Sequence, residues 1–104
     1  MKKVIVRYKV KLDKAKQNIE YIQNVFNALE KSKPEGLRYS SFQLEDGVSF
    51  VHIASIETED GSNPLSAFDE FKSFTKDISS RCEEAPVASD ANIIGNYRLL
   101  NNQL

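Results

Sequence analysis

The sequence has no tryptophan, one cysteine, one histidine and four glycines in 104 residues. The lone Cys82 cannot form an internal disulfide, which is typical of proteins from a reducing compartment. One histidine and one cysteine are too few for a zinc site of the usual nitrogen and sulfur ligands. The scattered glycines form no phosphate-binding loop. These absences leave few residue types that can carry chemistry.

The chain also lacks an excess of either charge and a long apolar run. Its formal net charge is −1, with acids and bases interspersed, so no basic surface for nucleic acid or an anionic membrane is expected. The first six residues resemble the start of a signal peptide, but Arg7 and Lys9 interrupt the apolar run. No stretch approaches the ~20 apolar residues that a membrane-spanning helix needs. We expect a cytoplasmic protein with a single domain over residues 1–104 and no membrane contact.

Residues 37–56 are the most informative segment, and they predict a β-hairpin. Asp46 and Gly47 favour a two-residue type I′ turn, in which both residues have positive φ. That turn pairs Ser41 with His52. Apolar residues lie on both faces of the hairpin, whereas a sheet with one solvated face alternates apolar and polar residues. We therefore expect both faces of the hairpin to be buried against other parts of the protein or against a partner molecule.

The remaining patterns give the order of the elements. Residues 4–10 predict a strand, and residues 13–33 predict a helix with an apolar stripe. Asn63 and Pro64 are a typical helix start, and the residues that follow them carry a second apolar stripe at helical spacing. Residues 83–90 are interpreted as an extended connection and residues 93–100 as the last strand. The fold class is therefore α+β, a ferredoxin-like βαββαβ arrangement with a four-stranded antiparallel sheet and both helices on one face.

The uncovered face of that sheet has three candidate occupants: a second copy, a nucleic acid, or a ligand in a cavity formed by a dimer. RNA-recognition modules share the element order and carry an aromatic and basic motif on the third strand. Here Gly47, Phe50 and Val51 match that motif, but Asp46 replaces the basic residue and Val48 replaces an aromatic. We therefore expect no nucleic-acid partner, because the stacking and basic groups are missing.

Short segments spread over the chain carry a resemblance to known proteins: residues 7–11, 36–39, 46–52, 63–65, 81–84 and 95–98. Together they resemble the dimeric α/β-barrel proteins related to antibiotic-biosynthesis monooxygenases, and more narrowly an uncharacterised branch of small bacterial proteins. The resemblance implies a homodimer through the open sheet face, with a pocket between sheet and helices in each subunit. Characterised members oxidise quinols or polyphenols with dioxygen and without a cofactor. Haem-degrading members use Asn, Trp and His, and this chain lacks the Trp.

His52 is the first candidate for catalysis, because an ordinary imidazole pKa near 6.5 suits a general base. The predicted register places Tyr39, Ser41 and Gln43 on its face, where they could orient a phenolic ligand. The alternative interpretation is a structural histidine that hydrogen-bonds to Ser41, Tyr39 or a partner subunit.

Arg7 and Tyr97 are further candidate ligand contacts, because a guanidinium group holds a carboxylate or phenolate well. The alternative for Arg7 is surface charge or ion pairing at the dimer interface. The expected function is that of a cofactor-independent monooxygenase-like protein that acts on or binds a small aromatic or quinol-type ligand. The alternative is a dimeric binding or interaction protein without turnover, since a pocket with Tyr, Ser and His serves both.

Overall fold

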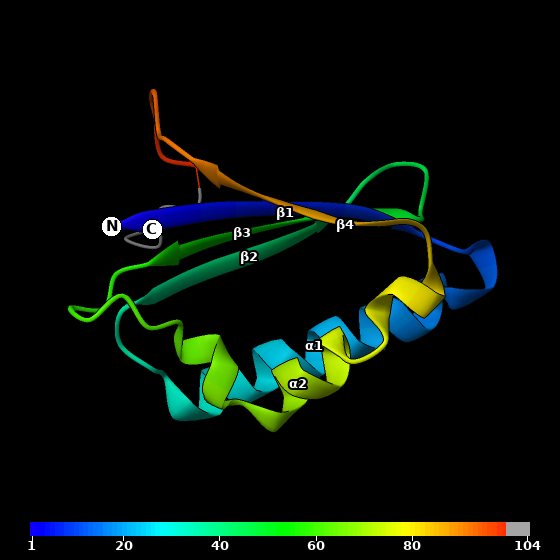
Figure 1. The fold of residues 1–104 in the computed structure, drawn as a ribbon, viewed down its shortest axis with the longest axis horizontal. Helices are drawn as coiled ribbons and strands as arrows, with labels where there is room; N and C mark the ends of the chain where they lie inside the picture. Colours follow the sequence, from blue (N-terminus) through cyan, green and yellow to red (C-terminus); the bar gives the residue numbers. More distant parts are fainter. Residues whose placement is uncertain (100–104) are drawn as a thin grey trace.

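The computed structural model describes residues 1–99, which form a four-stranded antiparallel sheet with helices on one face (Figure 1). The strand order is β2-β3-β1-β4, which confirms the predicted α+β, ferredoxin-like fold. None of the helices in this part of the chain is long and apolar enough to cross a membrane. The elements are β1 Lys2–Val10, α1 Ala15–Ser32, β2 Leu37–Gln43, β3 Ser49–Ile56, α2 Asp69–Thr75 and β4 Cys82–Ala91.

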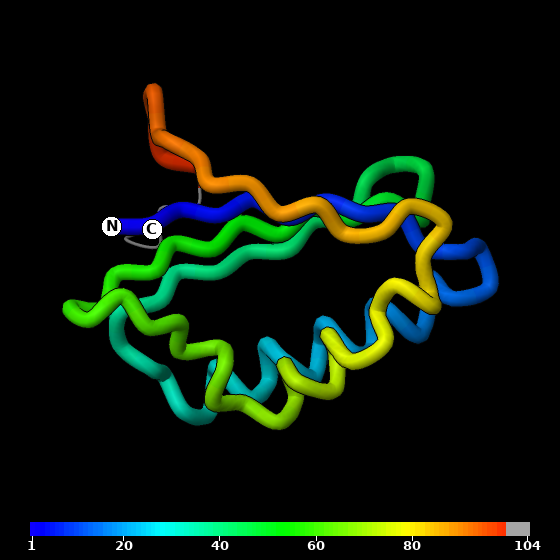
Figure 2. The backbone as a smooth tube through the Cα atoms, viewed as in Figure 1, coloured from blue at the N-terminus to red at the C-terminus, as the bar shows by residue number. Residues whose placement is uncertain are grey.

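The core lies between the sheet and the two helices, which form a second layer beneath it (Figure 2). Alternate residues of a strand point to opposite faces, so every second residue of β1 and β3 faces the helices. Val10 and Phe50 are 1% and 2% exposed, and Val25 of α1 meets them from the helical layer. The buried apolar cluster consists of Tyr8, Val10, Val25, Val48, Phe50, Leu65 and Phe74.

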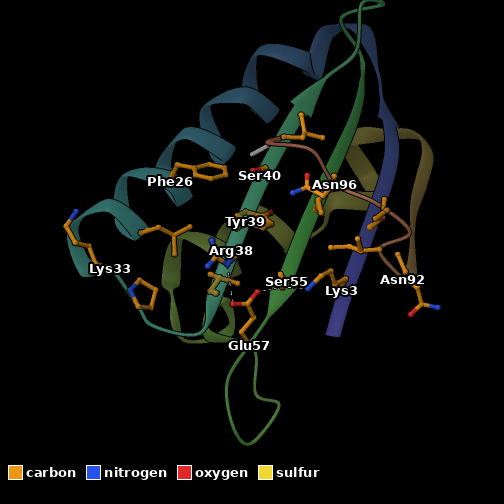
Figure 3. Close-up of a pocket in the computed structure, with 18 of the residues that line it drawn as sticks. Lys3, Phe26, Lys33, Arg38, Tyr39, Ser40, Ser55, Glu57, Asn92 and Asn96 are labelled. Carbon is orange, nitrogen blue, oxygen red and sulfur yellow. Dashed lines mark hydrogen bonds and ion pairs between the residues drawn. The ribbon is translucent and has the colours of Figure 1, made fainter. Parts of the chain in front are cut away.

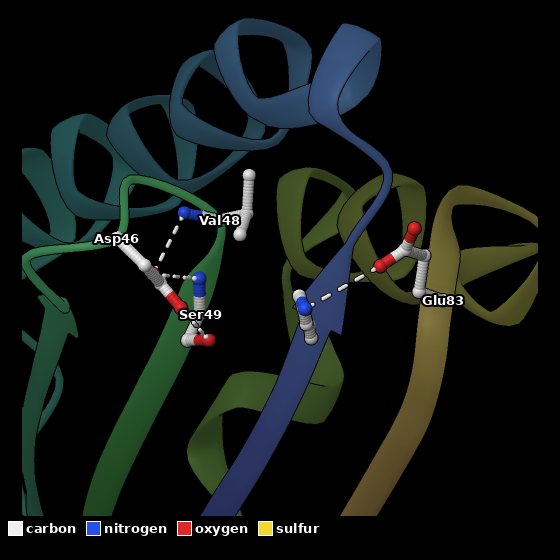
Figure 4. Close-up of polar contacts among 5 residues, drawn as sticks. Asp46, Val48, Ser49 and Glu83 are labelled. Carbon is white, nitrogen blue, oxygen red and sulfur yellow. Dashed lines mark hydrogen bonds and ion pairs between the residues drawn. The ribbon is translucent and has the colours of Figure 1, made fainter.

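The hairpin has the predicted register, but its turn differs from the prediction. Ser41 pairs with His52, as expected. Gly47 has φ 79°, whereas Asp46 does not have positive φ, so the type I′ turn is wrong. The Asp46 carboxylate instead accepts hydrogen bonds from the N–H groups of Val48 (3.0 Å) and Ser49 (2.8 Å) (Figure 4). A side chain thus stabilises the turn where two positive φ angles were expected.

The last strand begins at Cys82, eleven residues before the predicted start at residue 93. β4 occupies the segment interpreted as a connection and pairs with β1, while residues 93–99 form no strand and position 100 lies outside the described residues. Pro86 favoured a connection, yet a proline is tolerated in an edge strand and at a bulge. β4 is such an edge, and its register shifts between the partners of Arg7 and Lys9. The C-terminal segment, residues 92–99, instead rises on the side away from the helices (Figure 1).

The second helix is shorter than the apolar stripe predicts. Asn63 caps a turn as expected, because its side chain accepts a hydrogen bond from the N–H of Leu65 (3.0 Å). That turn, residues 64–67, is a 3-10 helix, and the extended backbone of Phe68 (ψ 128°) separates it from α2. Asp77, with φ 56°, separates α2 from a further 3-10 turn over residues 78–81. Three short segments therefore replace one helix.

The sheet face away from the helices, here called the open face, consists of cross-strand rows that the register defines. We name three of them from one end of the sheet to the hairpin turn. They are the charged row Arg38–Ser55–Lys3–Ala91, the isoleucine row Ser40–Ile53–Ile5–Ser89 and the turn-end row Phe42–Val51–Arg7–Val87.

Candidate functional site

His52 lies in the layer between the sheet and the helices, where its side chain is 4% exposed. Its position in β3 alternates with open-face residues, so the strand directs it toward the helices. Its ring stacks between those of Tyr8 (centroids 5.3 Å apart) and Tyr39 (6.0 Å), and Phe26 of α1 stacks on Tyr39 at 5.2 Å. Aromatic packing therefore holds the imidazole in one orientation.

A chain of hydrogen bonds, here called the relay, runs through this stack from α1 to β2. Asn18 Nδ2 lies 2.9 Å from the Tyr8 hydroxyl, which lies 2.8 Å from Nε2 of His52. Nδ1 of His52 lies 2.5 Å from Oγ of Ser41 and 3.3 Å from the Tyr39 hydroxyl. Both hydroxyls therefore lie beside the same ring nitrogen of His52.

The relay has one direction that satisfies its members. An amide NH₂ only donates, so the Tyr8 hydroxyl accepts from Asn18 and donates its own proton to Nε2 of His52. The imidazole proton then lies on Nδ1 and is donated to Ser41. The Tyr39 hydroxyl, 3.3 Å from the same Nδ1, is the last member of the relay and keeps its own proton. Ser41 is therefore an acceptor of the imidazole and not a nucleophile that the imidazole activates.

Burial keeps the titratable members of the relay uncharged at neutral pH. Desolvation lowers the pKa of His52 to about 4 and raises the pKa of Tyr39 to about 12. Desolvation also raises the pKa of Tyr8, against the opposing effect of the hydrogen bond from Asn18. The physical cause is the same in each case, because a low-dielectric interior disfavours the charged form. The relay is thus a neutral network with a defined proton order.

The structure brings together only some of the residues that the sequence predicts as a site. Tyr39 and Ser41 both hydrogen-bond to Nδ1 of His52. Gln43 is exposed near the hairpin turn, where its amide donates to the carbonyl of Gly47. Two further candidates lie elsewhere: Arg7 is on the open face, and Tyr97 is 83% exposed in the C-terminal segment.

Tyr8 and Asn18 belong to the relay, although they are not among the site residues that the sequence predicts. Asn18 is 0% exposed, and its Oδ1 has no hydrogen-bond partner among residues 1–99. A signal was present, because Asn18 precedes Ile22 by four residues and Val25 by seven, on the buried stripe of α1. A polar residue on an apolar helical stripe indicates a buried hydrogen bond. Tyr8 similarly lies at one of the alternate positions of β1 that face the helices.

Arg81 is a second buried polar residue near the relay, with 6% of its surface exposed. Its guanidinium group donates to the carbonyls of Phe74 (2.6 Å) and Lys76 (3.3 Å) and lies 4.7 Å from the ring centroid of Tyr21. The last carbonyls of a helix lack partners within the helix. Arg81 therefore holds the end of α2 against α1, which is a structural role.

A groove of about 1090 Å³ adjoins the relay through Tyr39 (Figure 3). Its α1 arm is mostly apolar and aromatic, with two charged side chains among its lining residues. Its open-face arm lies over the charged row and the isoleucine row, beside the C-terminal segment. Within residues 1–99, no three His, Cys, Asp or Glu side chains lie close enough to hold a metal ion together. The α1 arm is lined by Phe26, Leu29, Glu30, Lys33, Pro34, Leu37 and Tyr39.

Two comparisons with known sequences find no match for the chain. No protein-family model matches it. No curated protein matches it either.

Solved structures share its fold at low sequence identity. A candidate antibiotic biosynthesis monooxygenase from Nitrosomonas europaea superposes with a TM-score of 0.71 and 16% identity over 89% of each chain. One from Caulobacter crescentus gives 0.66 and 20% identity over 90% of each chain. SnoaB, a cofactor-independent oxygenase from Streptomyces nogalater, gives 0.66 and 14% identity over 94% of this chain and 97% of its own, in its N63A variant. The resemblance that the sequence indicates is therefore confirmed at the level of the fold, which is that of the antibiotic biosynthesis monooxygenase-like proteins.

Proposed function

We propose that this protein is a cofactor-independent monooxygenase-like protein that takes a small aromatic, quinol-type ligand in the α1 arm of the groove. The observation that carries the proposal is the relay, because Tyr39 is both its last member and part of the groove lining. The fold shared with SnoaB, which is named a cofactor-independent oxygenase, supports the same class of reaction. Arg7 and Tyr97 have no part in this proposal.

The lining of the α1 arm suits a flat aromatic ring. Phe26 and Tyr39 stack on each other there, and Leu29, Pro34 and Leu37 complete an apolar wall. Aromatic rings favour stacked or edge-to-face contacts with such side chains. A phenolic oxygen of the ligand would then be near the one polar group that ends the relay.

The proposed chemistry assigns the electrons to the ligand and the positioning to the protein. A quinol is electron-rich, and its phenolate is the form that reduces dioxygen most readily. Tyr39 stays protonated at neutral pH, so it donates a hydrogen bond to the phenolate oxygen and stabilises that charge. His52, donating from Nδ1 toward Ser41 and Tyr39, holds this donor in place. The general-base role predicted for His52 stays a prediction, and in the relay the Nε2 lone pair of His52 accepts the Tyr8 hydroxyl proton.

Oxygen consumption tests the proposal directly. A panel of naphthohydroquinones is mixed with the protein, and oxygen uptake is followed with an electrode against the rate without protein. Tyr39→Phe keeps the ring and removes only the last proton of the relay. We expect it to lower the protein-dependent rate by about 10²-fold, the effect of losing one hydrogen-bond donor to a developing anion.

Tyr97→Phe is the matched control, because it makes the same change at an exposed tyrosine outside the α1 arm. We expect it to keep the full rate. Ligand binding without oxygen uptake would favour the alternative, a binding protein without turnover. If no compound of the panel binds and none increases oxygen uptake, both the oxygenase function and the binding function are refuted.

We also propose that two copies associate through the turn-end row of the open face. Phe42 and Val87 are 37% and 51% exposed there, beside Val51, and a sheet face of this kind is stabilised by burial. The expected outcome is a dimer in light scattering at micromolar concentration. Val87→Asp should yield monomers, whereas Leu12→Asp, at an apolar residue that is 83% exposed outside the sheet, should not. A monomeric parent protein would contradict the proposal.

A further inference from the structure

The charged row carries a hydrogen-bonded cluster at the end of the sheet far from the hairpin turn (Figure 3). Lys3 Nζ donates to Ser55 Oγ at 2.8 Å, and Ser55 donates to Oε2 of Glu57 at 2.6 Å. Nε of Arg38 donates to Oε1 of Glu57 at 3.3 Å. Ser55 is only 7% exposed, although no helix covers this face. The neighbouring polar side chains therefore cover the Ser55 hydroxyl on this face.

Two cations share one carboxylate in this cluster. Arg38 is ion-paired with Glu57, whereas the contacts described for Lys3 include a hydroxyl and no carboxylate. The hydrogen bond from Ser55, with smaller contributions from Arg38 and Lys3, lowers the pKa of Glu57, which therefore stays ionised at neutral pH. The cluster thus has one positive charge in excess. A monoanion matches that charge.

An apolar surface adjoins the cluster. Ile5 and Ile53 lie one row further along the sheet and are partly buried. Ile93 and Leu99 of the C-terminal segment line the same arm of the groove, and each exposes more than half of its surface. Small-molecule sites are typically mostly apolar with a few placed polar groups, which this arm reproduces.

We propose that the open-face arm binds an amphipathic monocarboxylate, with its carboxylate against Lys3 and Arg38 and its apolar body against Ile5 and Ile53. Carboxylates form charge-assisted hydrogen bonds with both kinds of cation. Displacing water from the isoleucine row adds the favourable burial of apolar surface.

This site is separate from the relay and from the turn-end row. Ser55 and His52 point to opposite faces of β3, because their positions differ by an odd number of residues. Ser55 and Val51 share the open face but lie four residues apart, which is about 13 Å along a strand. The proposal therefore does not depend on the proposed oxygenase function.

A pair of probes with the same ring tests the proposal on the full chain. 2-Naphthoate is an anion at pH 7, and 2-naphthalenemethanol is its neutral analogue. Each is titrated into ¹⁵N-labelled protein, and the amide shifts are mapped. We expect naphthoate to shift Lys3, Ile5 and Ile53, to bind about tenfold more tightly than the alcohol, and to lose that advantage in high salt.

Lys2 supplies the matched control, because it neighbours Lys3 but points to the other face and pairs with Asp90. Lys3→Gln should weaken naphthoate about tenfold, and Lys3→Arg should keep most of the affinity. Lys2→Gln should change nothing, and the amide spectrum of each variant reports its fold. Equal affinity for both probes, or equal effects of Lys2→Gln and Lys3→Gln, would overturn the proposal. Shifts confined to the α1 arm would also overturn it, while leaving the proposed oxygenase function intact.

Discussion

The burial of His52 predicts a pH dependence of stability that belongs to a single side chain. His52 is the only histidine of the chain, and desolvation lowers its pKa from 6.5 to about 4. The unfolded chain takes up a proton near pH 6.5, whereas the folded protein does not until about pH 4. Between these values the unfolded state binds more protons, so the free energy of unfolding falls as the pH falls. The stabilisation is complete above pH 6.5.

The magnitude follows from the difference between the two pKa values. About 2.5 pH units at about 1.36 kcal/mol each correspond to about 3 kcal/mol. The slope should be about 1.4 kcal/mol per pH unit from pH 6.5 to 4. A small domain has a total stability of about 5–15 kcal/mol, so the loss is readily measured.

Urea denaturation at fixed protein concentration between pH 7.5 and 4 measures this effect. Carboxylates titrate in part of this range too, so the parent is compared with His52→Gln, whose amide does not titrate. We expect the free energy of unfolding of the parent, minus that of His52→Gln, to fall by about 3 kcal/mol between pH 7.5 and pH 4. The imidazole resonances should titrate near pH 4. Parallel stability curves, or a midpoint near 6.5, would refute the argument from burial.

Three further predictions concern two glycines, an arginine and the relay. A Cβ at Gly36 would lie 2.7 Å from a side-chain carbon, while nothing lies within 4 Å at Gly61, and both have positive φ. Gly61→Ala should lower the free energy of unfolding by about 1–2 kcal/mol, the cost of a left-handed backbone at a residue with a Cβ. Gly36→Ala should lower it by more, because the Cβ also clashes, and urea titration measures both. Equal losses would contradict the clash. Arg81→Met should lower the free energy of unfolding by about 1–3 kcal/mol in the same assay, because two carbonyls at the end of α2 lose their donor; no change would contradict that role. The ¹⁵N shifts of His52 at pH 7 should show the ring proton on Nδ1, because the Tyr8 hydroxyl donates to Nε2. A proton on Nε2 would refute the assigned direction of the relay.

Local sequence patterns were enough to predict the hairpin pairing and the helix cap, because both depend on side chains close together in the chain. The alternation around Ser41 and His52 predicts the hairpin pairing that the structure has. The cap at Asn63 is also where the sequence places it. Both depend on residues close together in the chain, and such interactions are readable from spacing alone.

The predictions failed where distant contacts outweigh local preference. Pro86 indicates a connection by itself, yet pairing with β1 makes its segment an edge strand with a bulge. The apolar stripe after Asn63 suggests one helix, whereas the backbone at Phe68 and Asp77 divides it. Tertiary packing thus overrides weak intrinsic propensities.

The sequence by itself determined the ferredoxin-like order, the register of the hairpin and the placing of Tyr39, Ser41 and His52 on one face. Those properties follow from periods of two and 3.6 residues, which are local. Only the tertiary structure decided that this face is buried and that Asn18 completes the relay through Tyr8. It also decided that Lys3 and Arg38 flank Ser55 on the open face. Such contacts join residues 10 to 52 positions apart, and packing alone brings them together.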